Sequence, residues 1–128
     1  MTTTLPLQGS SVEQFSISRA LIIIALRQET SHATISIDVP FEMRNPLSGI
    51  TSISTSNPSS LVHMLELLEA SVISAVTHAN GALQIEFSGG RTIVVSPDHQ
   101  FEAWEFAASN GHRIVCIRGG ELVVWPPD

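Results

Sequence analysis

Residues 83–96 read LQIEFSGGRTIVVS, and this stretch carries the clearest structural signal in the chain. Apolar and polar residues alternate from Leu83 to Phe87, which is the two-residue period of a strand that buries one face. Gly89-Gly90 can adopt the backbone angles of a tight turn, and the segment 91–96 that follows is rich in β-branched residues. The stretch therefore predicts an antiparallel hairpin.

The same pattern of short strands and turn pairs recurs on both sides of this hairpin. Asn80-Gly81, Asn110-Gly111 and Gly119-Gly120 each read as a turn between two strands. Further strands are expected over residues 12–18, 20–27, 33–41, 71–78, 102–108, 113–118 and 121–125. The prediction is an α+β fold with a mainly antiparallel sheet of about eight strands.

One amphipathic helix is expected near residues 58–70. Asn57-Pro58 suits a helix start, because Asn can cap free amide groups and Pro fits the first helical position. Apolar residues then recur at α-helical spacing, at Leu61, Met64, Leu65 and Leu68. The preceding segment, residues 44–57, is predicted to be a long connection because it is rich in Ser, Thr, Asn, Pro and Gly.

Length and composition indicate one globular domain. The chain has 128 residues, of which 43% are hydrophobic and 14% charged. The domain is expected to span residues 12–128 and to follow a loose tail over residues 1–11. The longest apolar run, residues 20–26, is far shorter than the roughly 20 residues of a membrane helix. A lone cysteine, Cys116, and the lack of a basic signal region point to the cytoplasm.

The charge of the chain restricts its partners. Twelve acidic residues face six basic ones, all of them Arg, and the net charge is −6. Such a surface repels nucleic acid and anionic membranes, so neither is expected as a partner. A basic protein is the partner that this charge favours.

Two features could carry chemistry. Asp98, His99 and Glu102 lie close in sequence and could bind a metal or share a proton, but no further ligand stands at a defined spacing, so no metal or cofactor is expected. A solvated turn after Pro97 is the simpler interpretation. Cys116 lies within an apolar strand, where burial disfavours the reactive thiolate. The protein is therefore not expected to be an enzyme.

The C-terminal third carries a dense run of motifs: Pro97-Asp98, Phe101-Glu102-Ala103-Trp104, Val115-Cys116 and Gly119-Gly120-x-Leu122-x-x-Trp125. This run resembles the bacterial domain of unknown function 6188 family. Two positions depart from the family pattern, since Phe101 stands where Tyr is common and Arg118 where Pro often precedes the glycine pair. In their small size, acidic charge and single domain, proteins of this kind resemble the immunity proteins of polymorphic toxin systems.

The first functional hypothesis is a non-catalytic immunity, or antitoxin-like, protein that binds a cognate toxin such as a basic nuclease-like effector. Its expected contact residues are Glu66, Glu69, Asp98, Glu102 and Glu105, which have few basic residues near them in sequence. The alternative is a small-molecule-binding protein or hydrolase that uses Asp98, His99 and Glu102. A third hypothesis is a homodimer that pairs through an exposed strand edge.

Overall fold

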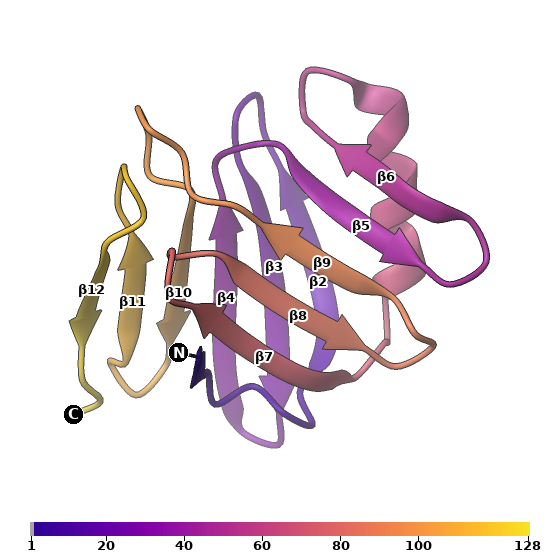
Figure 1. The fold of residues 1–128 in the computed structure, drawn as a ribbon. Coiled ribbons are helices and arrows are strands. Elements are labelled where there is room, and N and C mark those ends of the chain that lie inside the picture. Colours follow the sequence, from indigo (N-terminus) through magenta and orange to yellow (C-terminus); the bar gives the residue numbers. More distant parts are fainter. Residues whose placement is uncertain (1) are drawn as a thin grey trace.

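The computed structural model describes residues 2–128, which form twelve strands and one 3₁₀ helix (Figure 1). The elements are β1 (Thr2–Thr4), β2 (Ser11–Ile17), β3 (Ile22–Gln28), β4 (Ser31–Ile37), β5 (Phe41–Asn45), β6 (Gly49–Ile53), η1 (Pro58–Leu67), β7 (Val72–His78), β8 (Leu83–Phe87), β9 (Thr92–Val95), β10 (Trp104–Ala108), β11 (Arg113–Cys116) and β12 (Leu122–Trp125). Each pair of neighbouring strands is antiparallel.

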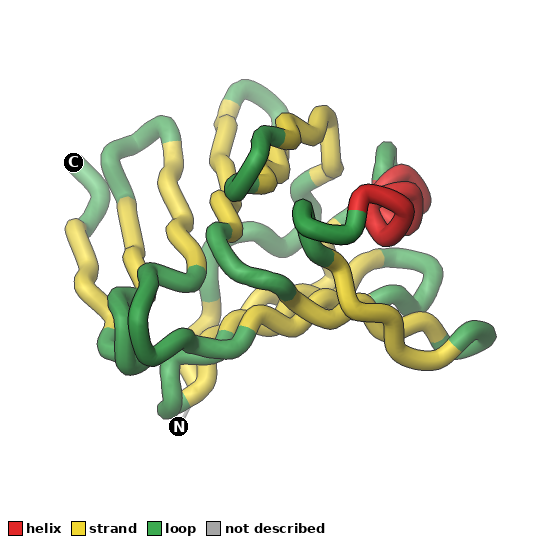
Figure 2. Tube along the Cα trace, turned by 90° about the horizontal axis from the view of Figure 1, so that it is seen from above, coloured by secondary structure: helices red, strands yellow, loops and turns green. Residues whose placement is uncertain are grey.

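The strands form two six-stranded sheets that pack face to face. Sheet A has the order β1-β7-β8-β9-β5-β6, and sheet B has the order β12-β11-β10-β4-β3-β2. Figure 1 shows the strands of sheet A crossing in front of those of sheet B. Figure 2 shows the two layers from above, with the helix at one end and the C-terminal strands at the other. The architecture is a β-sandwich with one short helix.

The core lies between the sheets and is built mainly from alternate residues of the strands, as the alternation over residues 83–87 predicted for β8. Strands β3 and β8 show this most regularly, because every second side chain is no more than 2% exposed: Ile22, Ile24, Leu26, Leu83, Ile85 and Phe87. Trp104 and Phe106 of β10 are buried in the same core. The predicted antiparallel character is thus confirmed.

The predicted number of about eight strands is wrong, chiefly because one hairpin was missed. Residues 33–41 do not form a single strand: β4 ends at Ile37, and the chain crosses to sheet A before β5 begins at Phe41. Pro40 lies in this crossing, where it needs no ladder hydrogen bond. The predicted connection over residues 44–57 contains most of the β5–β6 hairpin, whose polar outer face hid the alternation.

The expected loose tail over residues 1–11 is part of the sandwich where the structure describes it. Residues Thr2–Thr4 form β1, which pairs with β7. Leu5 and Leu7 are each 1% exposed, and the Leu5 amide donates a 2.8 Å hydrogen bond to the carbonyl of Ala75. Met1, the first residue of the predicted tail, lies outside the described residues. Burial of the two leucines explains why this segment is ordered.

The helix exists, but it is a 3₁₀ helix that ends at Leu67, not an α-helix reaching residue 70. Its inward side chains recur every three residues, as the tighter 3₁₀ turn requires, with Leu61 half-buried and Met64 and Leu67 fully buried. Leu65 and Leu68, predicted to face the core by α-helical spacing, are exposed instead. Between residues 2 and 128, no helix combines the length and apolar character needed to cross a membrane.

Two turns from different sheets are packed directly against each other. The Asn80-Gly81 turn joins β7 to β8 in sheet A, and Gly119-Gly120 joins β11 to β12 in sheet B. A side chain on Gly120 would collide with the backbone oxygen of Asn80, and one on Gly81 would collide with that of Gly120. The buried Trp104 Nε1 donates a 2.9 Å hydrogen bond to the Gly81 carbonyl. We call this contact, formed by these two turns and Trp104, the turn lock.

Substitution of the two adjacent glycines should separate backbone strain from steric exclusion. Gly119 and Gly120 have φ angles of +87° and +97°, but only at Gly120 would a methyl group meet other atoms. We expect Gly119→Ala to lower the free energy of unfolding by about 1 kcal/mol and Gly120→Ala by about 3 kcal/mol. Chemical denaturation measures both values. If both variants lose the same free energy of unfolding, the loss comes from the positive φ angle alone, and the close contact of Gly120 with Asn80 adds nothing to it.

Candidate functional site

The five predicted contact residues lie at two ends of the molecule. Glu66 and Glu69 belong to the end of η1 and the residues after it, whereas Asp98, Glu102 and Glu105 belong to β10 and the connection before it. Figures 1 and 2 place the helix and β10 on opposite sides of the sandwich. The five residues therefore do not form one surface, and each end has to be considered separately.

At the β10 end, the fold brings a third carboxylate to Glu102 and Glu105. Asp38 follows β4, and its amide donates a 3.0 Å hydrogen bond to the carbonyl of Ala103. Strand β10 pairs with β4 so that Glu105 lies opposite Ser36, on the outer face of sheet B. Asp38, Glu102 and Glu105 thus share one face, and we call these three residues the acidic cluster.

The acidic cluster is electrostatically crowded. Partial burial of Asp38, followed by repulsion from Glu102 and from Glu105, raises the pKa of its carboxyl group. Glu105 accepts a 2.6 Å hydrogen bond from Arg113 Nε. Asp38 and Glu102 form no ion pair with any residue in the described part of the chain. The cluster therefore carries more negative charge than its own arginine neutralises.

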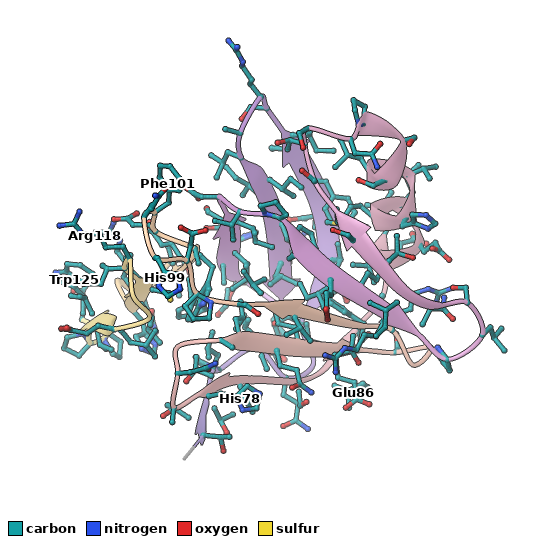
Figure 3. The ribbon with its side chains drawn as sticks, turned by 45° about the horizontal axis from the view of Figure 1, so that its top comes forward. His78, Glu86, His99, Phe101, Arg118 and Trp125 are labelled. Atoms are coloured by element: carbon teal, nitrogen blue, oxygen red, sulfur yellow. The ribbon has the colours of Figure 1, made fainter. Side chains whose placement is uncertain are left out.

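Exposed aromatic side chains flank the cluster. Phe101, in the connection before β10, is 61% exposed, and Trp125, at the end of β12, is 44% exposed. The guanidinium of Arg113 lies 4.6 Å from the centre of the Trp125 ring, so it connects Glu105 to the aromatic ring. Figure 3 shows Phe101 and Trp125 at the same end of the molecule, together with His99 and Arg118.

Asp98, His99 and Glu102, the residues of the alternative catalytic hypothesis, do not converge as the ligands of a metal site would. Asp98 Oδ1 accepts hydrogen bonds from the amides of Gln100 (2.7 Å) and Phe101 (3.1 Å), and the Asp98 carbonyl accepts one from Gly119. The Asp98 side chain therefore stabilises the turn in which it lies. His99 and Glu102 are exposed, and within residues 2–128 no three His, Cys, Asp or Glu side chains come together as metal ligands. The hydrolase alternative remains an untested hypothesis.

Of the two helix-end residues, Glu66 is internally paired. Its carboxylate oxygens lie 3.1 Å from Arg91 Nη2 and 3.5 Å from His63 Nδ1. The contact with Arg91 links the helix to the end of the β8–β9 turn, whereas His63 belongs to the helix itself. Glu66 is therefore partly neutralised by its own chain, which makes it a weaker candidate for binding a basic partner than the acidic cluster.

Glu69 lines a wide groove of about 880 Å³ between the end of η1 and strands β2 and β3. The lining residues are Ser11, Val12, Glu13, Arg27, Glu29, Leu68 and Glu69. Glu29 and Glu69 are the non-glycine residues with positive φ in the described chain, at 54° and 67°. Arg27 lies 3.5 Å from Glu13 and partly neutralises the groove.

Sequence reasoning missed Asp38, Glu13 and Glu29 as companions of the predicted residues. Asp38 falls within the segment 33–41 that was predicted to be a strand, and it lies directly after β4. Its proximity to Glu102 depends on the pairing of β4 with β10, two strands that are distant in the sequence. Glu13 and Glu29 join Glu69 only because β2 and β3 lie beside the end of the helix. No local sequence signal could have identified either grouping.

Comparison with protein families gives one match. The model of a family described as "Family of unknown function (DUF6188)" matches residues 3–126. The chain belongs to this family. The resemblance inferred from the C-terminal third is therefore confirmed, and it extends over nearly the whole chain. No curated protein and no solved structure matches the chain.

Most residues of the family-like motifs have structural roles in this member of the family. Trp104 and Gly120 form the turn lock, and the Asp98 backbone binds the amide of Gly119. Cys116 is fully buried, and burial raises the pKa of its thiol, as expected for a structural cysteine. The exposed exceptions are Phe101, Glu102 and Trp125, which border or belong to the acidic cluster.

The raised pKa of Asp38 predicts an effect of pH on stability. In the unfolded chain Asp38 has a pKa near 3.8, so between that value and its higher folded pKa the folded state binds more protons. The contribution of Asp38 to stability therefore falls as pH rises through this window. We expect Asp38→Asn to raise the melting temperature at neutral pH, with a gain that shrinks as pH falls towards about 4.

Thermal melts followed by circular dichroism across this pH range provide the test. Glu86→Gln is the matched control, because Glu86 is an exposed acid on the outer face of sheet A, away from the cluster (Figure 3). If both variants show the same dependence of melting temperature on pH, the electrostatic crowding inferred for Asp38 is wrong.

Proposed function

We propose that this protein is an immunity protein that neutralises a cognate toxin by binding it through the acidic cluster and the flanking aromatic residues. One observation carries the proposal: Asp38 and Glu102 form no ion pair among the described residues, and partial burial together with repulsion from Glu102 and Glu105 raises the pKa of Asp38. A cation supplied by another protein would relieve this repulsion. Binding energy would therefore be gained at a site that is unfavourable in the free protein.

The surroundings of the cluster support a macromolecular partner over a small ligand. Glu105 lies on the outer face of sheet B, and the cavity that Asp38 lines has a volume of only about 200 Å³, which is below the usual size of a ligand pocket. Phe101 and Trp125 add exposed aromatic area beside the charges. Aromatic and arginine side chains are enriched among the residues that dominate protein interfaces, and Arg113 joins Trp125 to the cluster.

The net charge and the rigidity of the site favour fast and specific association. A net charge of −6 attracts a basic partner over a distance, which raises the association rate. Strand β10 is held by pairing on both sides and by the Trp104 hydrogen bond of the turn lock. Little side-chain or backbone ordering is then needed on binding, which lowers its entropic cost. The partner that these properties suit is a basic effector, such as a nuclease-like toxin, and the proposed place of action is the cytoplasm.

Three charge reversals test the proposal and locate the contact. Glu102→Arg changes the acidic cluster, Glu69→Arg changes the groove, and Glu86→Arg applies the same charge change to the outer face of sheet A. With a toxin encoded beside this protein as the partner, we expect Glu102→Arg to slow association about tenfold at low salt. Glu86→Arg should change the rate little.

Association rates measured by biolayer interferometry at low and high salt give the result, and survival of cells that co-express the toxin gives a second measurement. If Glu69→Arg slows association more than Glu102→Arg, the groove is the contact and the acidic cluster is not. If the toxin stays lethal and does not bind the wild-type protein, it is not the cognate partner and the immunity function is contradicted for this pair.

A further inference from the structure

The helix η1 presents three rows of side chains, because residues three apart lie directly above one another in a 3₁₀ helix. One row, formed by Leu61, Met64 and Leu67, packs on the sandwich. A second row is polar and contains His63 and Glu66. Figure 2 shows the helix at the margin of the sandwich, so only one of its sides meets the sheets. The third row is apolar and lies outside the core.

The third row consists of Val62, Leu65 and Leu68, and we call these residues the apolar stripe. They are 58%, 59% and 43% exposed. The Leu68 amide donates a 3.2 Å hydrogen bond to the Leu65 carbonyl, so the 3₁₀ spacing continues to Leu68 although the helix ends at Leu67. Single exposed apolar residues are common on protein surfaces, whereas a contiguous row of three is a feature typical of an interaction site.

The apolar stripe leads into the groove between η1, β2 and β3, because Leu68 belongs to both. The groove contains three carboxylates, those of Glu13, Glu29 and Glu69, and one cation, Arg27. Arg27 lies 3.5 Å from Glu13, while Glu29 and Glu69 form no ion pair among residues 2–128. Two carboxylates without a paired cation therefore lie at the end of the apolar stripe.

The spacing of the apolar stripe fits an α-helix. Residues three apart in a 3₁₀ helix are separated by about 6 Å along its axis. Successive turns of an α-helix are about 5.4 Å apart, which is nearly the same distance. A helix that lies along η1 can therefore place one apolar side chain per turn against each residue of the stripe.

Charge determines which kind of helix fits. The carboxylates of Glu29 and Glu69 attract Lys or Arg on a segment that reaches the groove, and they repel an acidic segment. A second copy of this chain is disfavoured by its net charge of −6, and so is an anionic membrane. The occupant that satisfies both the apolar stripe and the groove is an amphipathic helix that carries basic residues.

We propose that this surface binds an amphipathic, basic helical segment of another protein. The segment packs its apolar side chains on the apolar stripe and places Lys or Arg side chains in the groove beside Glu29 and Glu69.

This contact goes beyond the proposed toxin contact and does not rest on it. The helix and β10, which carries part of the acidic cluster, lie on opposite sides of the sandwich (Figures 1 and 2). One molecule can therefore bind a partner at each end. Peptide binding is measured without any toxin, so its failure would leave the toxin contact untouched.

Fluorescence anisotropy of a labelled synthetic peptide, titrated with the full chain, tests the proposal. The probe is a helical peptide of Leu, Ala and Lys in which Leu recurs at amphipathic helical spacing. We expect it to bind at least about tenfold more tightly than a peptide of the same composition in shuffled order, which lacks an apolar face. A peptide with Glu in place of Lys should not bind, because the groove is acidic.

Two pairs of matched variants assign the binding to this surface. Val62→Ser should weaken peptide binding about threefold and Glu69→Arg at least about tenfold. Val124→Ser and Glu86→Arg make the same changes at exposed positions on β12 and on the outer face of sheet A, and they should leave binding unchanged. Glu102→Arg should also leave it unchanged, since the acidic cluster lies at the other end.

Circular dichroism confirms that each variant is folded. The proposal is overturned if the probe does not bind, if the shuffled peptide binds equally well, or if Glu86→Arg or Glu102→Arg weakens binding as much as Glu69→Arg. Light scattering and co-sedimentation with phosphatidylcholine vesicles test the other occupants. A dimer that Val62→Ser dissociates assigns the apolar stripe to a second copy, and sedimentation with the vesicles assigns it to a lipid surface. Either result contradicts the proposal.

Discussion

The close approach of two backbone turns holds the two sheets of this protein in their observed relation. Gly81 and Gly120 face each other with no room for a side chain, and both have a positive φ that glycine adopts without strain. The hydrogen bond from Trp104 to the Gly81 carbonyl adds a directional contact inside the core. Sheet A and sheet B are thereby joined at one end of the sandwich by backbone atoms as well as by packed side chains.

This arrangement separates the residues that stabilise the fold from those available for binding. Trp104, Cys116 and Gly120 belong to the interior or to the turn lock, and Asp98 holds its own loop. The same strand, β10, presents Glu105 on its opposite face. A rigid inner face thus supports a charged outer face: Glu105 lies on β10 itself, Asp38 directly follows β4, and Glu102 lies two residues before β10.

The two ends of the sandwich differ in how their surfaces are closed. At the helix end, η1 packs beside β6, the segment after η1 bonds to β2, and Arg91 forms an ion pair with Glu66. At the C-terminal end, β12 has an uncovered edge and the acidic cluster has a single arginine, Arg113. Unpaired backbone groups and unpaired carboxylates therefore occur together at the end where β10, β11 and β12 lie.

Local patterns in the sequence determined much of this protein. Alternation over residues 83–87, together with the glycine-containing turn pairs, correctly predicted antiparallel strands, because strand periodicity and positive φ are properties of short segments. The family was also readable from the motifs of the C-terminal third. The hairpin of β5 and β6 was missed because its polar outer face and turn residues resemble a loop.

Only the tertiary structure decided which charges meet and which edge stays open. Asp38 lies beside Glu102 and Glu105 because β4 pairs with β10, and the five predicted acids separate because η1 and β10 occupy opposite ends. The helix follows a three-residue repeat that its α-like apolar spacing did not predict, because packing against the sandwich overrides local preference. Contacts between distant segments depend on strand order, and strand order is set by the packing of the whole core.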